Sequence, residues 1–129
     1  MRLALLSTSD TDLLSARASG ADWLLANPSR LDTDTIGELV AGCELVVVRI
    51  LGTVRSWQAG FDALADTGLP LVVLGGEQTP DAELMEQSTV PVGTAAQSHA
   101  YLAQGGPDNL RELHAFLAGT VLMLSLIHI

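Results

Sequence analysis

The stretch ELVVVRIL, residues 44–51, has the strongest strand signal in the chain. After Glu44 it is a continuous run of apolar, mostly β-branched residues, in which Arg49 is the single charged side chain. A strand of this kind is usually covered on both faces, because a strand with one solvated face shows alternating polar residues. The stretch therefore predicts a buried strand of a parallel sheet.

Strand and helix signals alternate on both sides of this stretch. The expected strands are 3–6, 22–26, 44–51, 71–74 and a short one within 88–92. The expected helices are 10–18, a segment capped by Asp32 and ending at Gly42, 56–66, a segment capped by Thr79 with Pro80 as its first residue, 94–104 and 108–118. Such alternation predicts a doubly wound α/β fold with right-handed crossovers. We expect one domain, residues 1–123, with a mostly parallel, flavodoxin-like sheet of four to five strands and additional C-terminal helices.

The helix expected at 10–18 has a clear starting signal. Ser9 and Asp12 stand at the spacing of a capping box, in which a carboxylate serves the first turn. We expect Leu13 and Leu14 to be directed inward.

Composition excludes several functional classes. The 129 residues carry a net charge of −9 and six arginines without any lysine, which argues against nucleic acid and anionic membrane as partners. The single Cys43 excludes an intramolecular disulfide and a cysteine-built zinc site, and we expect it to be a buried thiol. Because the opening MRLALLSTSD lacks a signal-peptide pattern and no apolar run is long enough to span a bilayer, we expect a cytoplasmic protein.

Ligands of open parallel sheets bind at the carboxyl ends of the strands, where the loops 7–12, 49–55 and 75–80 are expected. Gly75 and Gly76 allow a sharp turn, with positive φ, and a close approach by another group. Glu77 shares this space with Arg49 if their strands are adjacent. Arg49 can pair structurally with Glu77 or Asp10, or bind an anionic ligand. We take Arg49, Gly75, Gly76 and Glu77 as a candidate ligand-binding crevice.

Other chemical motifs are missing from the sequence. There is no phosphate-binding glycine loop, no G-x-S-x-G, no HExxH and no catalytic Cys–His pairing. His99 and His114 are expected to be packed or half-exposed helix residues rather than metal ligands. We therefore assign no catalytic and no metal-binding residue.

A family resemblance extends this interpretation. The run LVVVRILGTVRSWQAGFDAL, followed by LPLVVLGGEQTPDAELMEQSTVPVGTAAQSHAYLAQGGPDNLRELHAFL, resembles the amino-terminal region of the large subunit of aerobic cobaltochelatase. This is the CobN family, which is related to the large subunit of magnesium chelatase. The opening LALLSTSDTDLLSARAS fits the same region, so the resemblance covers nearly all of residues 1–123. Its most specific part is GGEQTPDAELMEQSTVP with AYLAQGGPDNL after it.

The resemblance implies ATP-dependent insertion of Co²⁺ into hydrogenobyrinic acid a,c-diamide during cobalamin biosynthesis. In that family the large subunit binds the tetrapyrrole and the metal, and separate AAA-type and integrin-I-like subunits supply ATP hydrolysis, with Mg²⁺. The family subunit is much longer, so this chain would be its first portion and the remainder of the subunit would be its partner. No catalytic residue is carried over, and we expect the fragment to bind no cofactor and to be inactive alone. A stand-alone α/β module that binds a small ligand or a protein is the alternative.

Residues 124–129, LSLIHI, are expected to be foreign to the natural protein. They match the translation of a transposase adaptor used in sequencing libraries, and such segments are excluded from fold reasoning. His128 would then not be a ligand. A genuine apolar helix end or strand is the alternative.

Overall fold

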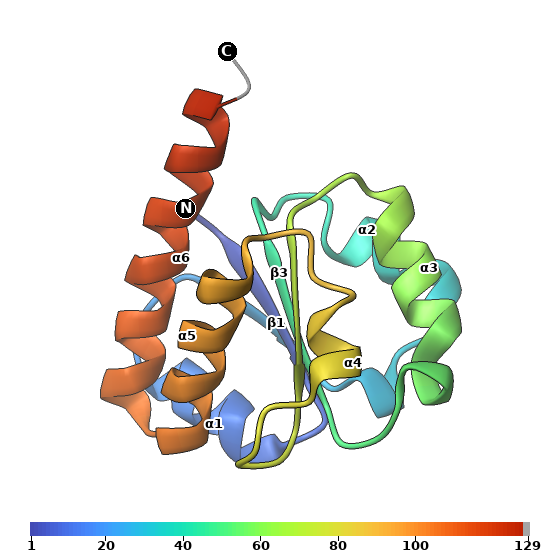
Figure 1. Cartoon of the computed structure of the whole chain (residues 1–129), viewed down its shortest axis with the longest axis horizontal. Helices are drawn as coiled ribbons and strands as arrows, with labels where there is room; N and C mark the ends of the chain where they lie inside the picture. Colours follow the sequence, from blue (N-terminus) through green and yellow to red (C-terminus); the bar gives the residue numbers. More distant parts are fainter. Residues whose placement is uncertain (128–129) are drawn as a thin grey trace.

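The computed structural model describes residues 1–127 of the chain, so His128 lies outside the described residues. Within this range it shows a parallel sheet between two layers of helices (Figure 1). The strands are β1 Leu3–Ser7, β2 Trp23–Ala26, β3 Val46–Ile50 and β4 Leu71–Gly75. Their order is β2-β1-β3-β4, and every neighbouring pair is parallel. This confirms the doubly wound prediction, with the first four strands in the flavodoxin-like order.

Helices cover both faces of the sheet. Those of the described residues are α1 Asp10–Ala18, α2 Ile36–Leu39, α3 Gln58–Asp66, α4 Ala82–Met85, α5 Val92–Gln104 and α6 Pro107–Ile127. In Figure 1, α1, α5 and α6 lie on one side of the sheet and α2 and α3 on the other. The segment after Asp32 is shorter than predicted, because a 3-10 turn at Thr33–Thr35 leaves only one turn for α2. No helix of residues 1–127 is long and apolar enough to cross a membrane.

Successive residues of each central strand enter opposite halves of the core. Leu5 and Val47 belong to the cluster packed under α1, α5 and α6, whereas Ala4 and Val48 belong to the cluster under α2 and α3. All five residues of β3 are buried, which confirms that this strand is covered on both faces. Cys43 is buried in the second cluster, as predicted, and this burial raises the pKa of its thiol.

The strand predicted within 88–92 does not form. Side chains from this segment instead bind the outer edge of β4, where Leu71 N donates to Thr89 Oγ1 at 2.8 Å and Val73 N donates to Ser88 Oγ at 2.8 Å. Thr89 N donates to Leu71 O at 2.9 Å. The two hydroxyls thus take the positions that main-chain groups of another strand would occupy, and they close an edge that would otherwise be free to pair.

The start of α4 also differs from the prediction. Its N-cap is Asp81, whose carboxylate accepts a hydrogen bond from Leu84 N at 3.1 Å, and not Thr79. Pro80 therefore precedes the helix and is not its first residue. Aspartate binds the free N–H groups of a first turn well, and its position two residues later leaves room for a single turn, Ala82–Met85.

The last helix is longer than predicted. We expected it at 108–118, but α6 runs from Pro107 to Ile127. Leucine and methionine favour helix and no proline interrupts the run after Gly119. The helix includes residues 124–127 of the segment expected to be foreign, whose origin stays a prediction.

Candidate site at the carboxyl edge of the sheet

Arg49 is the centre of a buried polar cluster at the carboxyl ends of β1 and β3. The side chains of Arg49 and Asp12 are 6% and 7% exposed and form an ion pair, with Nη1 at 3.0 Å from Oδ2 and 3.2 Å from Oδ1. Ser7, which is the register partner of Arg49 on β1, donates from Oγ to Asp12 Oδ2 at 2.9 Å. Both oxygens of the carboxylate are therefore bonded to buried donors, as a charge removed from water requires.

The predicted ion-pair partners of Arg49 were wrong. Asp10 pairs with Arg30 at the surface, 3.2 Å apart, and the hydrogen bond from Arg30 lowers the pKa of Asp10. The side chain of Glu77 is exposed. Asp12 takes the role because it lies on the inner side of α1 together with Ala16, four residues later.

The orientation of α1 on the sheet also decides which of its two leucines is buried. Leu13 packs against the core, but Leu14 is exposed, although both were expected to be directed inward.

The capping box predicted for α1 forms only in part. Asp12 N donates to Ser9 Oγ at 3.3 Å, which is one half of the box. Its carboxylate does not complete the box, because Ser9 N donates to Ser7 Oγ instead.

The remaining donors of Arg49 join β4 to α5. Nε donates to Gly75 O at 3.0 Å, Nη1 to Leu102 O at 3.4 Å and Nη2 to the main-chain oxygen of Glu77 at 3.5 Å. Leu102 lies in the last turn of α5, where a cation is favourable. All three guanidinium nitrogens thus donate to the protein itself, and the buried side chain is used for internal contacts.

A second set of bonds holds the loop after β4 against α5. His99 Nε2 lies 2.9 Å from Glu77 O, and Gln78 Nε2 donates to Ala103 O at 3.1 Å. Glu77 therefore contributes its main chain to the cluster. Sequence reasoning missed Ser7, Asp12 and Gln78. A helical face from Asp12 to Ala16 was the one signal that could have identified the ion-pair partner.

Gly75 and Gly76 act by allowing close approach. Neither has the expected positive φ. A Cβ on Gly76 would lie 3.1 Å from Leu51 N and 3.2 Å from Ile50 C, and one on Gly75 would lie 2.9 Å from Asp81 Cβ. Gly76 N also donates to Ile50 O at 2.8 Å. The close-approach prediction is confirmed, and the approaching group belongs to the protein itself: the main chain of Ile50 and Leu51 at Gly76, and the Asp81 side chain at Gly75.

A small hollow lies beside Gly75 and Gly76. It has a volume of about 260 Å³ and is lined by Ile50, Leu51, Gly52, Gly75, Gly76, Glu77, Thr79, Pro80 and Asp81. Three of the four predicted crevice residues thus line one space, whereas Arg49 lies outside the lining. Two acidic side chains at the hollow disfavour an anion. Among residues 1–127 no three His, Cys, Asp or Glu side chains gather as a metal site.

Comparisons with known proteins find similarity in both sequence and fold. No family model matches the chain. It is 28% identical over 135 aligned residues to the aerobic cobaltochelatase subunit CobN of Pseudomonas aeruginosa, a match that covers 93% of this chain. A solved structure, the catalytic subunit of cobaltochelatase from Mycobacterium tuberculosis, is 57% identical with a TM-score of 0.91 over 95% of this chain. The chain is CobN-like.

The matches cover only part of each relative. The CobN-like chain spans 11% of the P. aeruginosa protein and 10% of the M. tuberculosis chain. It therefore corresponds to about a tenth of the length of either one.

The two helical histidines of the CobN-like chain are packed residues, as predicted. His99 is buried against the loop after β4. His114 is half-buried on α6, with Nε2 at 3.2 Å from Asp22 O and its ring edge-on to Trp23 at a centroid distance of 5.1 Å.

Replacing Gly76 tests the close contact between the two loops of the CobN-like chain. We expect Gly76→Ala to lower the free energy of unfolding by about 1–3 kcal/mol, because the new methyl group would lie closer than ordinary van der Waals contact to the main chain at Ile50 and Leu51. Urea denaturation measures this change. Gly37→Ala is the control, since a Cβ there meets nothing within 4 Å. Equal stability of the two variants would contradict the close approach.

Proposed function

We propose that this chain is the amino-terminal α/β domain of a cobaltochelatase large subunit. That subunit binds tetrapyrrole and metal for ATP-dependent insertion of Co²⁺ into hydrogenobyrinic acid a,c-diamide in cobalamin biosynthesis. One observation carries the proposal: the 57% identity to the M. tuberculosis catalytic subunit, at a TM-score of 0.91 over 95% of the chain. Identity at this level over a whole domain supports more than a shared fold.

The contribution of the domain is structural in this proposal. The remainder of the subunit is its partner, and AAA-type and integrin-I-like subunits handle ATP and Mg²⁺ in the cytoplasm. The carboxyl edge of the sheet supports a structural role, because Arg49 is buried and each of its guanidinium nitrogens donates to the protein itself. A 129-residue chain alone is accordingly inactive in metal insertion.

A chimera tests the proposal. Residues 1–123 replace the matched segment of the M. tuberculosis catalytic subunit, and cobalt insertion is assayed with the partner subunits of that enzyme. We expect activity within about tenfold of the parent, which corresponds to about 1.4 kcal/mol. The 129-residue chain alone and the parent subunit without the segment are the controls, and both are expected to be inactive. A folded chimera without activity would contradict the proposal and favour a stand-alone binding module.

A further inference from the structure

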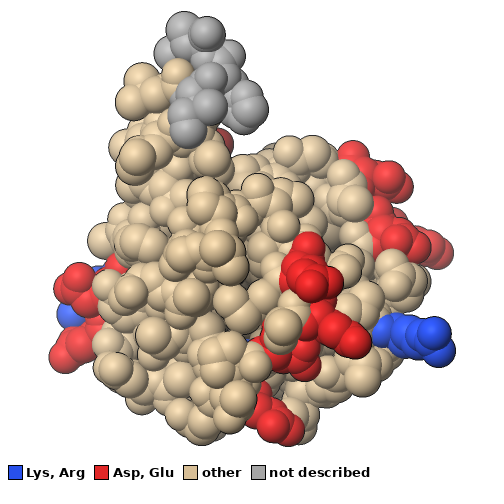
Figure 2. Space-filling model, in the orientation of Figure 1, with Lys and Arg blue, Asp and Glu red and all other residues tan. Residues whose placement is uncertain are grey.

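Charged residues are nearly absent from the last third of the chain. The whole sequence contains 15 acidic and six basic residues, yet only Asp108, Arg111 and Glu112 lie beyond Glu86. These three occupy the first two turns of α6. In Figure 2 acidic side chains gather toward α4, whereas the surface over α5 and the middle of α6 shows almost no charge.

The exposed residues of α5 and α6 are mostly small or apolar. Representative exposed residues are Val92, Ala96 and Ala100 on α5 and Ala115, Gly119 and Leu122 on α6. Each set recurs every three to four residues, which places its members on one side of their helix. We call this surface the α5–α6 face.

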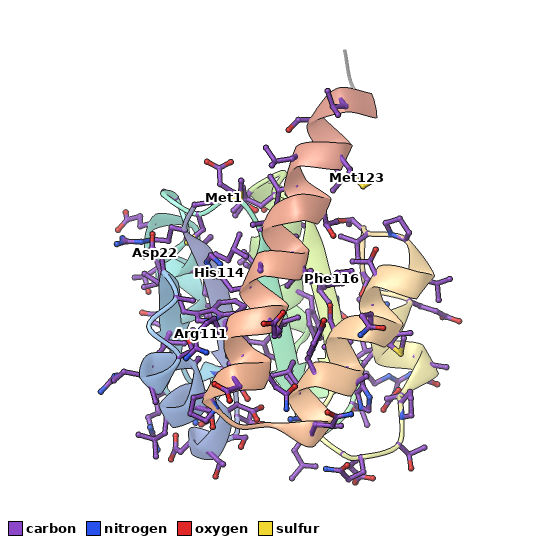
Figure 3. All side chains as sticks on the ribbon, turned by 90° about the vertical axis from the view of Figure 1, so that its left-hand side faces the viewer. Met1, Asp22, Arg111, His114, Phe116 and Met123 are labelled. Atoms are coloured by element: carbon purple, nitrogen blue, oxygen red, sulfur yellow. The ribbon has the colours of Figure 1, made fainter. Side chains whose placement is uncertain are left out.

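The α5–α6 face is continuous across the two helices. Tyr101 and Phe116 pack between them, with ring centroids 6.1 Å apart. Figure 3 shows α5 and α6 side by side across the front, with Phe116 between them and Met123 projecting from α6 on the side where α5 lies. Leu122 and Met123 are 60% and 66% exposed, so the apolar surface continues along α6 beyond its contact with α5.

We infer that the α5–α6 face is covered by the remainder of a longer cobaltochelatase-type subunit, an inference that rests on the proposed function. The M. tuberculosis chain carries the matched segment as only 10% of its length. Domains within one chain contact each other through interfaces of about 600–1,500 Å², so we expect a domain joined to so much further chain to have a surface that packs against it. Interface cores are depleted in charge and enriched in apolar groups, which is the character of this face.

The opposite helical layer is unsuited to the same role. Glu38 on α2 and Asp62 and Asp66 on α3 are exposed there, and burying unpaired carboxylates is costly. Ala115 and Gly119, in contrast, let another helix approach the backbone of α6 closely, with Leu122 and Val92 as apolar contacts. The two layers thus differ in charge: the α2–α3 surface is suited to solvent, and the α5–α6 face is suited to docking.

Cysteine labelling in the chimera described above tests this inference. Ala115→Cys reports on the α5–α6 face, and Ala59→Cys on α3 is the matched control, since both alanines are exposed helix residues. Buried Cys43 reacts slowly in either setting. In the 129-residue chain we expect both introduced thiols to react with a maleimide at similar rates. In the chimera we expect Ala115→Cys to react about tenfold or more slowly and Ala59→Cys to be unchanged, because a covered thiol reacts only on local opening.

Three results would overturn the inference. Ala115→Cys could react equally fast in both settings, or Ala59→Cys could be the protected residue instead. Protection of Ala115→Cys that depends on concentration in the isolated chain would mean that a second copy covers the face. Labelling and catalysis separate this inference from the proposed function. A chimera that protects Ala115→Cys but inserts no cobalt retains the docking surface and loses the function. An active chimera that leaves Ala115→Cys unprotected retains the function and contradicts the docking surface.

Discussion

Arg49→Leu is expected to lower the free energy of unfolding by about 3–5 kcal/mol, because it leaves Asp12 as a buried charge without a partner. Arg49 and Asp12 are almost fully buried, and the substitution also removes donors from Gly75 O, Leu102 O and Glu77 O. The loss therefore affects the ends of β3, β4 and α5 together. Urea denaturation followed by tryptophan fluorescence measures the change.

Two variants show whether burial of the ion pair is the cause. Arg2→Leu removes an ion pair with Asp22 that is half-exposed on both sides, and it should cost only about 0–1 kcal/mol. The double variant Arg49→Leu with Asp12→Leu removes both charges, so it should be less destabilised than Arg49→Leu alone. A single variant as stable as Arg2→Leu would rule out a structural role for the buried pair.

Leu113→Ala is expected to lower the free energy of unfolding by about 2–5 kcal/mol, because the shortened side chain leaves a cavity in the core. Leu113 on α6 is fully buried in the cluster that also contains Leu5 and Val47 of the sheet. The substitution therefore tests whether the last helix belongs to the folding unit of the sheet.

Leu122→Ala is the matched control on the same helix. Leu122 is 60% exposed, and its truncation in the 129-residue chain should change stability by no more than about 0.5 kcal/mol. Both variants have the same chemistry and nearly the same helix propensity, so the difference between them reports burial. Similar losses at the two positions would mean that α6 does not pack on the sheet as described.

Local patterns in the sequence determined the sheet and most of its helices. The apolar run around Val46–Ile50 predicted a strand covered on both faces, and the helix at 10–18 was predicted with the bounds that α1 has. The glycine pair predicted a close approach after β4. These features were readable because burial on one or both faces requires apolar residues at a fixed period, and that period is a property of neighbouring residues.

Only the tertiary structure decided how these elements meet. Asp10 and Asp12 are separated by about 200° around α1, so the rotation of the helix on the sheet selects which carboxylate reaches Arg49. Ser88 and Thr89 replace a strand because their hydroxyls meet the edge of β4. Gly76 lies tightly against the main chain of Ile50 and Leu51, which are far away in sequence. Contacts of this kind depend on orientation between distant segments, and a pattern of neighbouring residues does not contain that information.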